Sequence, residues 1–272
     1  MRCKMYKIGS IGAGNMGLAI IDGAVGCKAF SSSDVAIFDI CQDKIDLCKS
    51  KGYSVLPSEE DIFINCEIVL LAVKPQIYES LLNKLKSISQ KVKNQIIITI
   101  AAGISTSYIQ GFLGKDTKVI RVMPNTPLLI GRGACAFSKT ENVNDDEFNK
   151  ILRIFENMGE VAVIPEDHMN DIIAANGSSP AYVYYFIDCI TRSVEKMGVG
   201  KDVAKKLVAQ TFVGAAEMVL KTGKEPKELI QQVCSPGGTT IESIKVFDEK
   251  NLYSIINESC VKCVNRAYEL NA

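Results

Sequence analysis

The first part of the chain alternates between short apolar runs and segments whose apolar residues recur every three or four positions. Such runs are typical of strands covered on both faces, and the periodic segments are typical of amphipathic helices. Repeated strand–helix units predict a parallel, doubly wound sheet. The expected strands are 6–12, 35–40, 67–73, 95–103, 118–125, 133–138 and 160–165, and the expected helices are 16–25, 44–51, 77–88, 105–113 and one around 151–158.

After Pro165 the strand pattern stops, and helical patterns continue to the end of the chain. The segment AYVYYFIDCI is apolar on nearly every side, which predicts a buried helix. Such a helix in a short helical domain indicates an interleaved dimer of two copies. The expected helices lie at about 168–176, 180–197, 201–222, 226–233, 239–248 and 251–270.

The charge balance gives no reason to expect a nucleic-acid or membrane partner. The 272 residues include 31 Lys and Arg and 31 Asp and Glu, so no overall field attracts a polyanion. No apolar run approaches the roughly 18 residues of a membrane span. The apolar run near the start contains a glycine turn, so we expect no signal peptide and a cytoplasmic protein.

Cysteine and histidine indicate neither a metal site nor a histidine-pair mechanism. Of ten cysteines only Cys260 and Cys263 form a CxxC, with no second pair or histidine nearby. Zinc takes about four ligands, so we expect no metal and reduced thiols. His168 is the single histidine, and we expect it to be a charged or hydrogen-bonded surface residue.

The sequence IGAGNMG places Gly12, Gly14 and Gly17 as GxGxxG between the first strand and its helix. This is the context of a dinucleotide-binding turn, where the glycines allow a tight turn, a close approach to pyrophosphate and close helix packing. The helix N-terminus then offers free N–H groups to the phosphates. We therefore predict an α/β Rossmann-type doubly wound sheet over residues 1–165, followed by an all-α helical dimerisation domain over 166–272.

Asp39 ends the second expected strand, 22 residues after Gly17. An acid near this spacing can hydrogen-bond the ribose hydroxyls of NAD, and it repels the 2′-phosphate of NADP. Lys44 and Lys49 lie on the following helix, and no arginine stands beside Asp39. We therefore expect NADH to be favoured over NADPH. The alternative is that Asp39 only caps the next helix.

Further candidates stand where expected strands end, because ligands of open α/β sheets bind at the carboxyl ends of the strands. AVKP and AAG can border the cofactor there, and Lys74 is either catalytic or a solvated charge. Asn125 and Thr126 in MPNTP line a pocket in one interpretation, and in the other the two prolines of this segment simply fix a turn. Ser178 is expected to cap a helix, with pocket lining as its second role.

The sequence SPGGTT, residues 235–240, is a second glycine-rich turn that opens onto a helix. Its N–H groups and the helix dipole suit an anion such as a carboxylate. The residues alone leave a second interpretation open, in which the segment is an interhelical turn capped by Thr239 or Thr240.

Five motifs together resemble the pyrroline-5-carboxylate reductase family: IGAGNMG, AVKPQ, RVMPNTP, NGSSPAYVYYF and SPGGTTI. They occur in the family's order over nearly the whole chain, and SPGGTTI is the most specific. The resemblance implies reduction of Δ1-pyrroline-5-carboxylate to L-proline by NAD(P)H, the last step of proline biosynthesis. It also implies active sites built by both subunits of a homodimer, and larger rings of dimers such as a decamer.

The resemblance also implies roles for individual residues. Thr240 would position the substrate ring and assist proton delivery to its nitrogen, with a water behind it. Ser179 and Thr239 depart from the family's common Gly and Ala, and Asp39 stands where NADPH-preferring relatives tend to have a small hydroxyl residue. The implied substrate contacts are Gly237, Gly238, Thr239 and Thr240, and the implied cofactor contacts are Ile11, Gly12, Ala13, Gly14, Asn15, Met16, Ala72, Val73, Lys74, Pro75, Ala101 and Ala102.

Two alternatives remain at this point. One is another enzyme of the same plan, a β-hydroxyacid dehydrogenase or a different imine reductase. The hydroxyacid enzymes usually carry a catalytic lysine after the nucleotide domain, whereas NDIIAANGSSPAYVYY contains none. The other alternative is a non-catalytic NAD(H)-binding protein, which would leave the SPGGTT turn without a role.

Overall fold

The computed structural model describes residues 5–90, 92 and 94–270. The chain forms two compact units. The first unit runs to Ser178 and takes in the chain again from Cys263, and the second unit is Ser179–Lys262. One helix, α11 (Leu252–Glu269), therefore contributes residues to both units.

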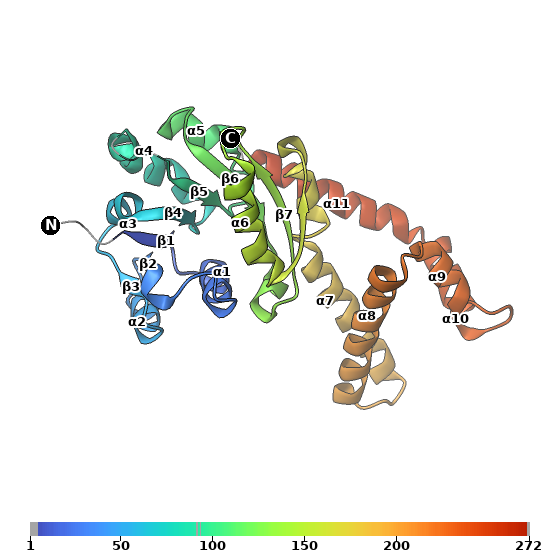
Figure 1. The fold of residues 1–272 in the computed structure, drawn as a ribbon. Helices are drawn as coiled ribbons and strands as arrows, with labels where there is room; N and C mark the ends of the chain where they lie inside the picture. Colours follow the sequence, from blue (N-terminus) through green and yellow to red (C-terminus); the bar gives the residue numbers. More distant parts are fainter. Residues whose placement is uncertain (1–4, 91, 93, 271–272) are drawn as a thin grey trace. The chain divides into compact units, whose positions relative to one another are not determined.

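The first unit is built on an eight-stranded sheet with the order β3-β2-β1-β4-β5-β6-β7-β8 (Figure 1). All neighbouring strands are parallel except β6 and β7, which are antiparallel. This order confirms the predicted doubly wound sheet, with the first strand near its middle. The strands are β1 Tyr6–Ile11, β2 Val35–Phe38, β3 Ser54–Val55, β4 Cys66–Leu71, β5 Ile96–Thr99, β6 Lys118–Met123, β7 Gly133–Lys139 and β8 Gly159–Val163.

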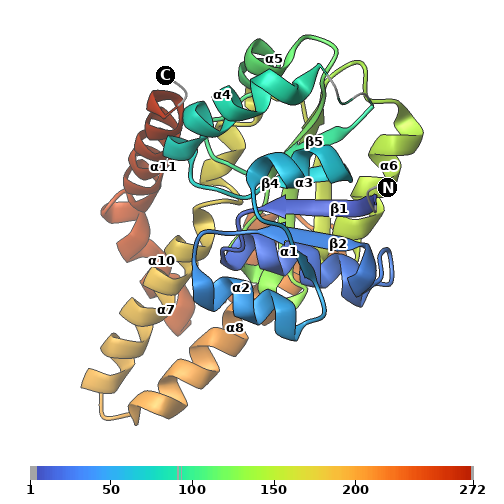
Figure 2. The ribbon, with the colours of Figure 1, turned by 90° about the vertical axis from the view of Figure 1, so that its left-hand side faces the viewer.

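Helices cover both faces of this sheet, as the continuous apolar character of its strands requires (Figure 2). One core lies between the sheet and helices α1 (Asn15–Gly26) and α6 (Asp145–Glu156), and α2 (Gln42–Ser50) adds the buried Cys48 to it. The other core lies under α3, α4 and α5, which span Glu59–Asn65, Tyr78–Ser89 and Thr106–Leu113.

Local sequence explains where several of these helices begin. Asn144 and Glu147 form a capping box before α6, in which each side chain accepts a hydrogen bond from the other residue's N–H. Ser58 accepts from the N–H of Asp61 at the start of α3. The sequence analysis missed α3 and β3, because a two-residue strand and a two-turn helix give too short a pattern.

The prediction of a helix at 168–176 is wrong. This stretch forms two 3₁₀ turns, Glu166–His168 and Asp171–Ala174. Two asparagines near these turns, Asn170 and Asn176, use their side chains in hydrogen bonds to residues of β6 and β7. Such polar anchors replace the regular backbone ladder of a helix with tertiary contacts.

The second unit is helical, as predicted. Its helices are α7 Ser179–Lys196, α8 Lys201–Thr222, α9 Pro226–Val233, α10 Thr239–Glu249 and the first part of α11. The predicted burial of the first of them is wrong within the single chain, because Tyr184 and Tyr185 are 58% and 67% exposed and only Thr191 is fully buried. Across the described ranges, no helix has the length and apolar character needed to cross a membrane.

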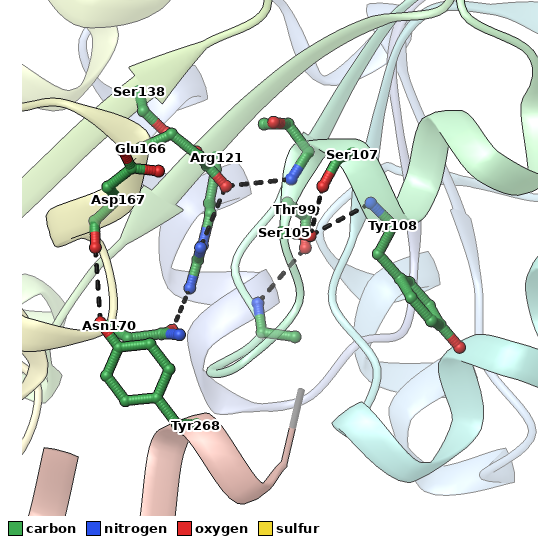
Figure 3. A network of polar contacts seen from close by, with 12 residues as sticks. Thr99, Ser105, Ser107, Tyr108, Arg121, Ser138, Glu166, Asp167, Asn170 and Tyr268 are labelled. Atoms are coloured by element: carbon green, nitrogen blue, oxygen red, sulfur yellow. Dashed lines mark hydrogen bonds and ion pairs between the residues drawn. The ribbon is translucent and has the colours of Figure 1, made fainter. Parts of the chain in front are cut away.

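A buried arginine ties the sheet to the segment that follows it (Figure 3). Arg121 on β6 is 2% exposed, and it donates to Glu166 at 3.0 Å and to Asn170 at 2.6 Å. Glu166 also accepts from the hydroxyl of Ser138 and, at 3.1 Å, from the N–H of Thr106. The network therefore fixes residues 166–170 against β6, β7 and the start of α5.

The end of α11 packs against the same segment. The Tyr268 hydroxyl donates to Asp171 at 2.9 Å, and Nδ1 of His168 lies 3.0 Å from the other carboxylate oxygen (Figure 3 shows Tyr268). These two bonds, that of His168 first, hold the pKa of Asp171 below its usual value. The exposed, hydrogen-bonded His168 confirms its predicted surface role. A Cβ on Gly103 would lie 2.9 Å from the Ala267 carbonyl oxygen, so α11 also touches the loop after β5.

We expect the substitution Arg121→Leu to lower the free energy of unfolding by about 3 kcal/mol, the low end for breaking a buried ion pair. The low end applies because the Glu166 side chain is 29% exposed and regains some water. Lys7→Gln is the control, since it breaks an exposed pair with Glu67 and should cost less than about 1 kcal/mol. Urea unfolding at one protomer concentration measures both, and equal losses would contradict the role of Arg121.

Candidate cofactor and substrate sites

The predicted cofactor residues converge on one edge of the sheet in the first unit. Strands β1, β4, β5 and β6 are parallel, so the loops that follow them leave the sheet at the same edge. The predicted residues on these loops and at the strand ends are Ile11 to Met16 after β1, Asp39 after β2, Ala72 to Pro75 after β4, and Ala101 and Ala102 after β5.

Two glycines after β1, Gly12 and Gly17, lie so close to the residue after β4 that neither position has room for a Cβ. A Cβ on Gly12 would lie 2.6 Å from the Ala72 carbonyl oxygen, and Gly12 has a φ of +101°. A Cβ on Gly17 would lie 2.7 Å from the Ala72 Cβ. Both positions therefore require glycine, for steric reasons and, at Gly12, also for its backbone conformation.

Gly14 behaves differently, because it faces open space. A Cβ there would meet no atom within 4 Å, and Gly14 and Asn15 are both exposed. Gly14 is the N-cap of α1, no side chain caps the helix, and its first turn holds no acidic residue. The uncapped helix start leaves room for a ligand's close approach, and its N–H groups and helix dipole have the chemistry that suits an anion such as a pyrophosphate.

Asp39 links the glycine turn to the loop after β2. One carboxylate oxygen accepts from the N–H of Ala13 at 2.6 Å and the other accepts from the N–H of Cys41 at 2.8 Å. The N–H of Gly12 donates to the Phe38 carbonyl at 2.8 Å. Cys41 is the N-cap residue of α2, and no side chain caps the first turn of that helix, so the alternative in which Asp39 only caps the next helix is not seen. Each carboxylate oxygen has a second lone pair, which leaves the acid able to bind a ribose hydroxyl.

Tyr78 links the carboxyl ends of β4 and β5. Its side chain is fully buried, its hydroxyl donates to the Leu71 carbonyl at 2.8 Å, and it shares a hydrogen bond of 2.8 Å with the Thr99 hydroxyl. Burial raises the pKa of Tyr78 above its ordinary value, so it remains a donor. The sequence analysis missed Tyr78, because only the folded chain brings the ends of the two strands to it.

Two buried asparagines organise the end of β6. Asn125 accepts from the N–H of Ala134 at 3.0 Å, which links the segment after β6 to the start of β7, and its predicted pocket-lining role stays a prediction. Asn176 donates its side-chain N–H groups to the carbonyls of Met123, at 2.7 Å, and Ala134, at 3.0 Å. The segment 176–178 therefore lies at the carboxyl end of β6. The sequence analysis did not single out Asn176, although it lies in the motif NGSSPAYVYYF.

The remaining predictions at this edge have simpler outcomes. Lys74 and Thr126 are exposed, and Lys74 is the N-cap of a 3₁₀ turn. The Ser178 hydroxyl accepts from the Cys263 thiol at 3.1 Å, and its capping role stays a prediction. Within the described part of the chain, no three His, Cys, Asp or Glu side chains are grouped so that they could hold a metal ion.

The predicted substrate loop lies in the second unit, before α10. Gly237 has a φ of +71°, and the N–H of Gly238 donates to the Ser235 carbonyl at 3.0 Å. The N-cap of α10 is Gly238 with no side-chain cap, so the alternative of a threonine N-cap is wrong. Thr239 is exposed and Thr240 is half-buried in the first turn, where helix N–H groups have no partner within the helix.

Comparison with known proteins agrees with this geometry. Residues 166–270 match the family described as pyrroline-5-carboxylate reductase dimerisation, and residues 7–103 match NADP oxidoreductase coenzyme F420-dependent. The pyrroline-5-carboxylate reductase of Escherichia coli (strain K12) is 34% identical over 266 residues, which are 97% of this chain and 98% of the relative. The chain belongs to the pyrroline-5-carboxylate reductase family.

Solved structures of this family have the same fold. The pyrroline-5-carboxylate reductase of Coxiella burnetii has a TM-score of 0.88 and 33% identity, covering 99% of this chain and 100% of that one. The Plasmodium falciparum pyrroline carboxylate reductase with NADP bound has a TM-score of 0.89 and 27% identity, covering 98% of each chain. The predicted fold class and the predicted family are therefore confirmed.

Membership of the pyrroline-5-carboxylate reductase family makes the chain an oxidoreductase and its helical part a dimerisation domain. The exposed apolar side chains of the second unit agree with a homo-oligomer, because exposed patches of this kind mark interfaces. They include Tyr184, Tyr185, Leu207, Leu220 and Tyr253, which are 58% to 78% exposed.

We expect Gly14→Ala and Gly12→Ala to separate binding from folding. Gly14→Ala should change the free energy of unfolding by less than about 1 kcal/mol, since its Cβ meets no protein atom. It should weaken NAD(P)H binding at least about tenfold, because the Cβ stands where the pyrophosphate must approach. Gly12→Ala should cost more than about 1 kcal/mol of stability.

Urea unfolding and titration of NADH fluorescence measure the two effects of these substitutions. Unaltered cofactor affinity in the Gly14→Ala variant would place the pyrophosphate elsewhere.

Proposed function

We propose that the chain reduces Δ1-pyrroline-5-carboxylate to L-proline with NAD(P)H, the last step of proline biosynthesis. The observation that carries this proposal is the 34% identity to the Escherichia coli pyrroline-5-carboxylate reductase over nearly both whole chains. The open glycine turn before α1 and the SPGGTT loop before α10 support it, because each offers free N–H groups to an anion.

The cofactor side of the reaction uses the first unit. The bound nicotinamide supplies the hydride that adds to the imine carbon of the substrate. The N–H groups of Gly14 and Asn15 hold the pyrophosphate, and Asp39 orients the adenosine ribose through its free lone pairs. Val73, Pro75, Ala101 and Ala102 border the rest of the cofactor.

The substrate side uses the loop at Gly237–Thr240. The substrate carboxylate accepts from the free N–H groups of the first turn of α10, and the helix dipole adds to this attraction. The positive φ of Gly237 lets the chain turn tightly into that helix. Thr239 is exposed and contributes its backbone N–H to the same site.

Thr240 is the proposed catalytic residue. Hydride addition to a neutral imine would leave negative charge on the ring nitrogen, so the nitrogen must be protonated or hydrogen-bonded as the hydride arrives. A threonine hydroxyl is too weak an acid to donate a proton freely. Its role is to hold the ring in place and to pass on a proton from a water molecule.

Asp39 favours NADH over NADPH in this proposal. Its half-exposed carboxylate already takes up the N–H of Ala13, so it is held in place beside the glycine turn. A fixed negative charge near the adenosine ribose accepts from its hydroxyls and repels a 2′-phosphate.

A homodimer is the proposed active unit. The apolar faces of the helical unit need a partner of the same surface chemistry, and a second copy provides it. Larger rings, up to the expected decamer, would repeat this dimer.

The first test mixes the purified protein with pyrroline-5-carboxylate and follows the absorbance of NADH and NADPH in parallel. We expect both to be oxidised as proline forms, with the higher kcat/KM for NADH. No oxidation of either cofactor would overturn the proposed function and leave the fold unaffected.

We expect Asp39→Ser to lower the ratio of kcat/KM for NADH to that for NADPH at least about tenfold, the size of a lost charged hydrogen bond. The kcat/KM for NADH should itself fall, because Asp39 also holds the glycine turn. Asp43→Ser removes an exposed acid in the first turn of α2 and is the matched control. A ratio that stays constant in Asp39→Ser would remove Asp39 from cofactor selection.

We expect Thr240→Ala to lower kcat/KM by about one to three decades without a change in NADH affinity, as for one lost positioning group. Thr240→Ser keeps the hydroxyl and should recover most of the activity. Thr211→Ala, which removes an exposed hydroxyl bonded only to its own helix, is the control. Wild-type turnover in Thr240→Ala would exclude the assigned role.

A further inference from the structure

Asn176 carries a buried acceptor that has no donor in the described part of the chain. Its side chain is 8% exposed, and its Oδ1 lacks a hydrogen-bond partner. The amide orientation is fixed, because Nδ2 donates to two carbonyl oxygens, those of Met123 and Ala134. A buried acceptor left unpaired is unfavourable, so a donor from outside the chain is expected to complete it.

The position of Asn176 limits which donor that can be. It lies at the carboxyl end of β6, where Met123 is the last strand residue. Met123 belongs to a small apolar cluster with Ala102, which follows β5. A dinucleotide whose pyrophosphate binds at Gly14 and whose adenosine lies on the β2 side extends its other half past β4 toward β5 and β6. Asn176 is therefore on the nicotinamide side of the edge.

The nicotinamide ring carries a carboxamide, which has an N–H₂ donor and a carbonyl acceptor. Resting on the proposed function, we propose that Oδ1 of Asn176 accepts a hydrogen bond from this carboxamide N–H₂. The bond would fix the rotation of the nicotinamide ring and therefore the face from which the hydride leaves. Asn176 would be a cofactor-binding residue. Its two Nδ2 hydrogen bonds, to Met123 and Ala134, would keep Oδ1 in a fixed orientation.

The test compares NADH with reduced 3-acetylpyridine adenine dinucleotide, which carries a methyl group where the carboxamide has its N–H₂. Dissociation constants of both are measured by fluorescence titration for the wild type and for Asn176→Ala. We expect Asn176→Ala to weaken NADH about five- to tenfold, the size of one hydrogen bond. The dissociation constant of the analogue should stay within about twofold.

Asn170→Ala is the matched control, because Asn170 is another buried asparagine of the same segment, with its Oδ1 engaged by Arg121. It should leave the NADH-to-analogue affinity ratio unchanged. If Asn176→Ala does not fold, Asn176→Ser replaces it, since a serine hydroxyl can still donate to one of the two carbonyls but is too short to replace Oδ1.

Equal weakening of both cofactors in the Asn176 variant would overturn the inference, because it would mean a general disturbance of the edge. The inference alone would be overturned if the wild type oxidises NADH with pyrroline-5-carboxylate but the Asn176 variant keeps the wild-type ratio of NADH affinity to analogue affinity. A wild type that binds neither cofactor would instead overturn the proposed function.

Discussion

The close approach of the β1–α1 turn to the end of β4 is the constraint on which the rest of the site depends. Neither Gly12 nor Gly17 has space for a Cβ beside Ala72, because Gly12 lies against the Ala72 backbone and Gly17 against its Cβ. The same turn exposes Gly14 and the first N–H groups of α1. The turn is therefore crowded on one side and open on the other, which holds the uncapped start of α1 at a fixed position relative to the strand ends.

Buried polar side chains then hold the other loops of this edge in place. Tyr78 links the ends of β4 and β5. Asn176 links the end of β6 to Ala134 on β7. Arg121 anchors the segment that leads to Asn176. Buried hydrogen bonds of this kind favour one arrangement, because breaking them would leave further buried polar groups unpaired. A site assembled from separate loops needs such support to keep its geometry.

The sequence predicts the parts of the molecule that repeat a simple pattern. Strand–helix alternation and the GxGxxG turn are enough to predict a doubly wound sheet with a glycine turn before its first helix. The 3₁₀ turns at 166–174 and the roles of Tyr78 and Asn176 were not predictable in this way. Each depends on partners brought together by the fold: the Tyr78 hydroxyl meets Thr99, and Asn176 meets Met123, 53 residues away. A local sequence pattern does not predict contacts between residues that are far apart in the sequence.

The helix α7 shows a different limit. Its apolar pattern predicts burial, yet Tyr184 and Tyr185 are mostly exposed in the single chain. A sequence is adapted to the molecule that functions, and for a dimerisation domain that molecule contains a second copy. The disagreement between pattern and exposure is therefore itself information, because it identifies the surface that only the partner covers. For this chain that surface belongs to the helical unit, which also carries the proposed substrate loop SPGGTT.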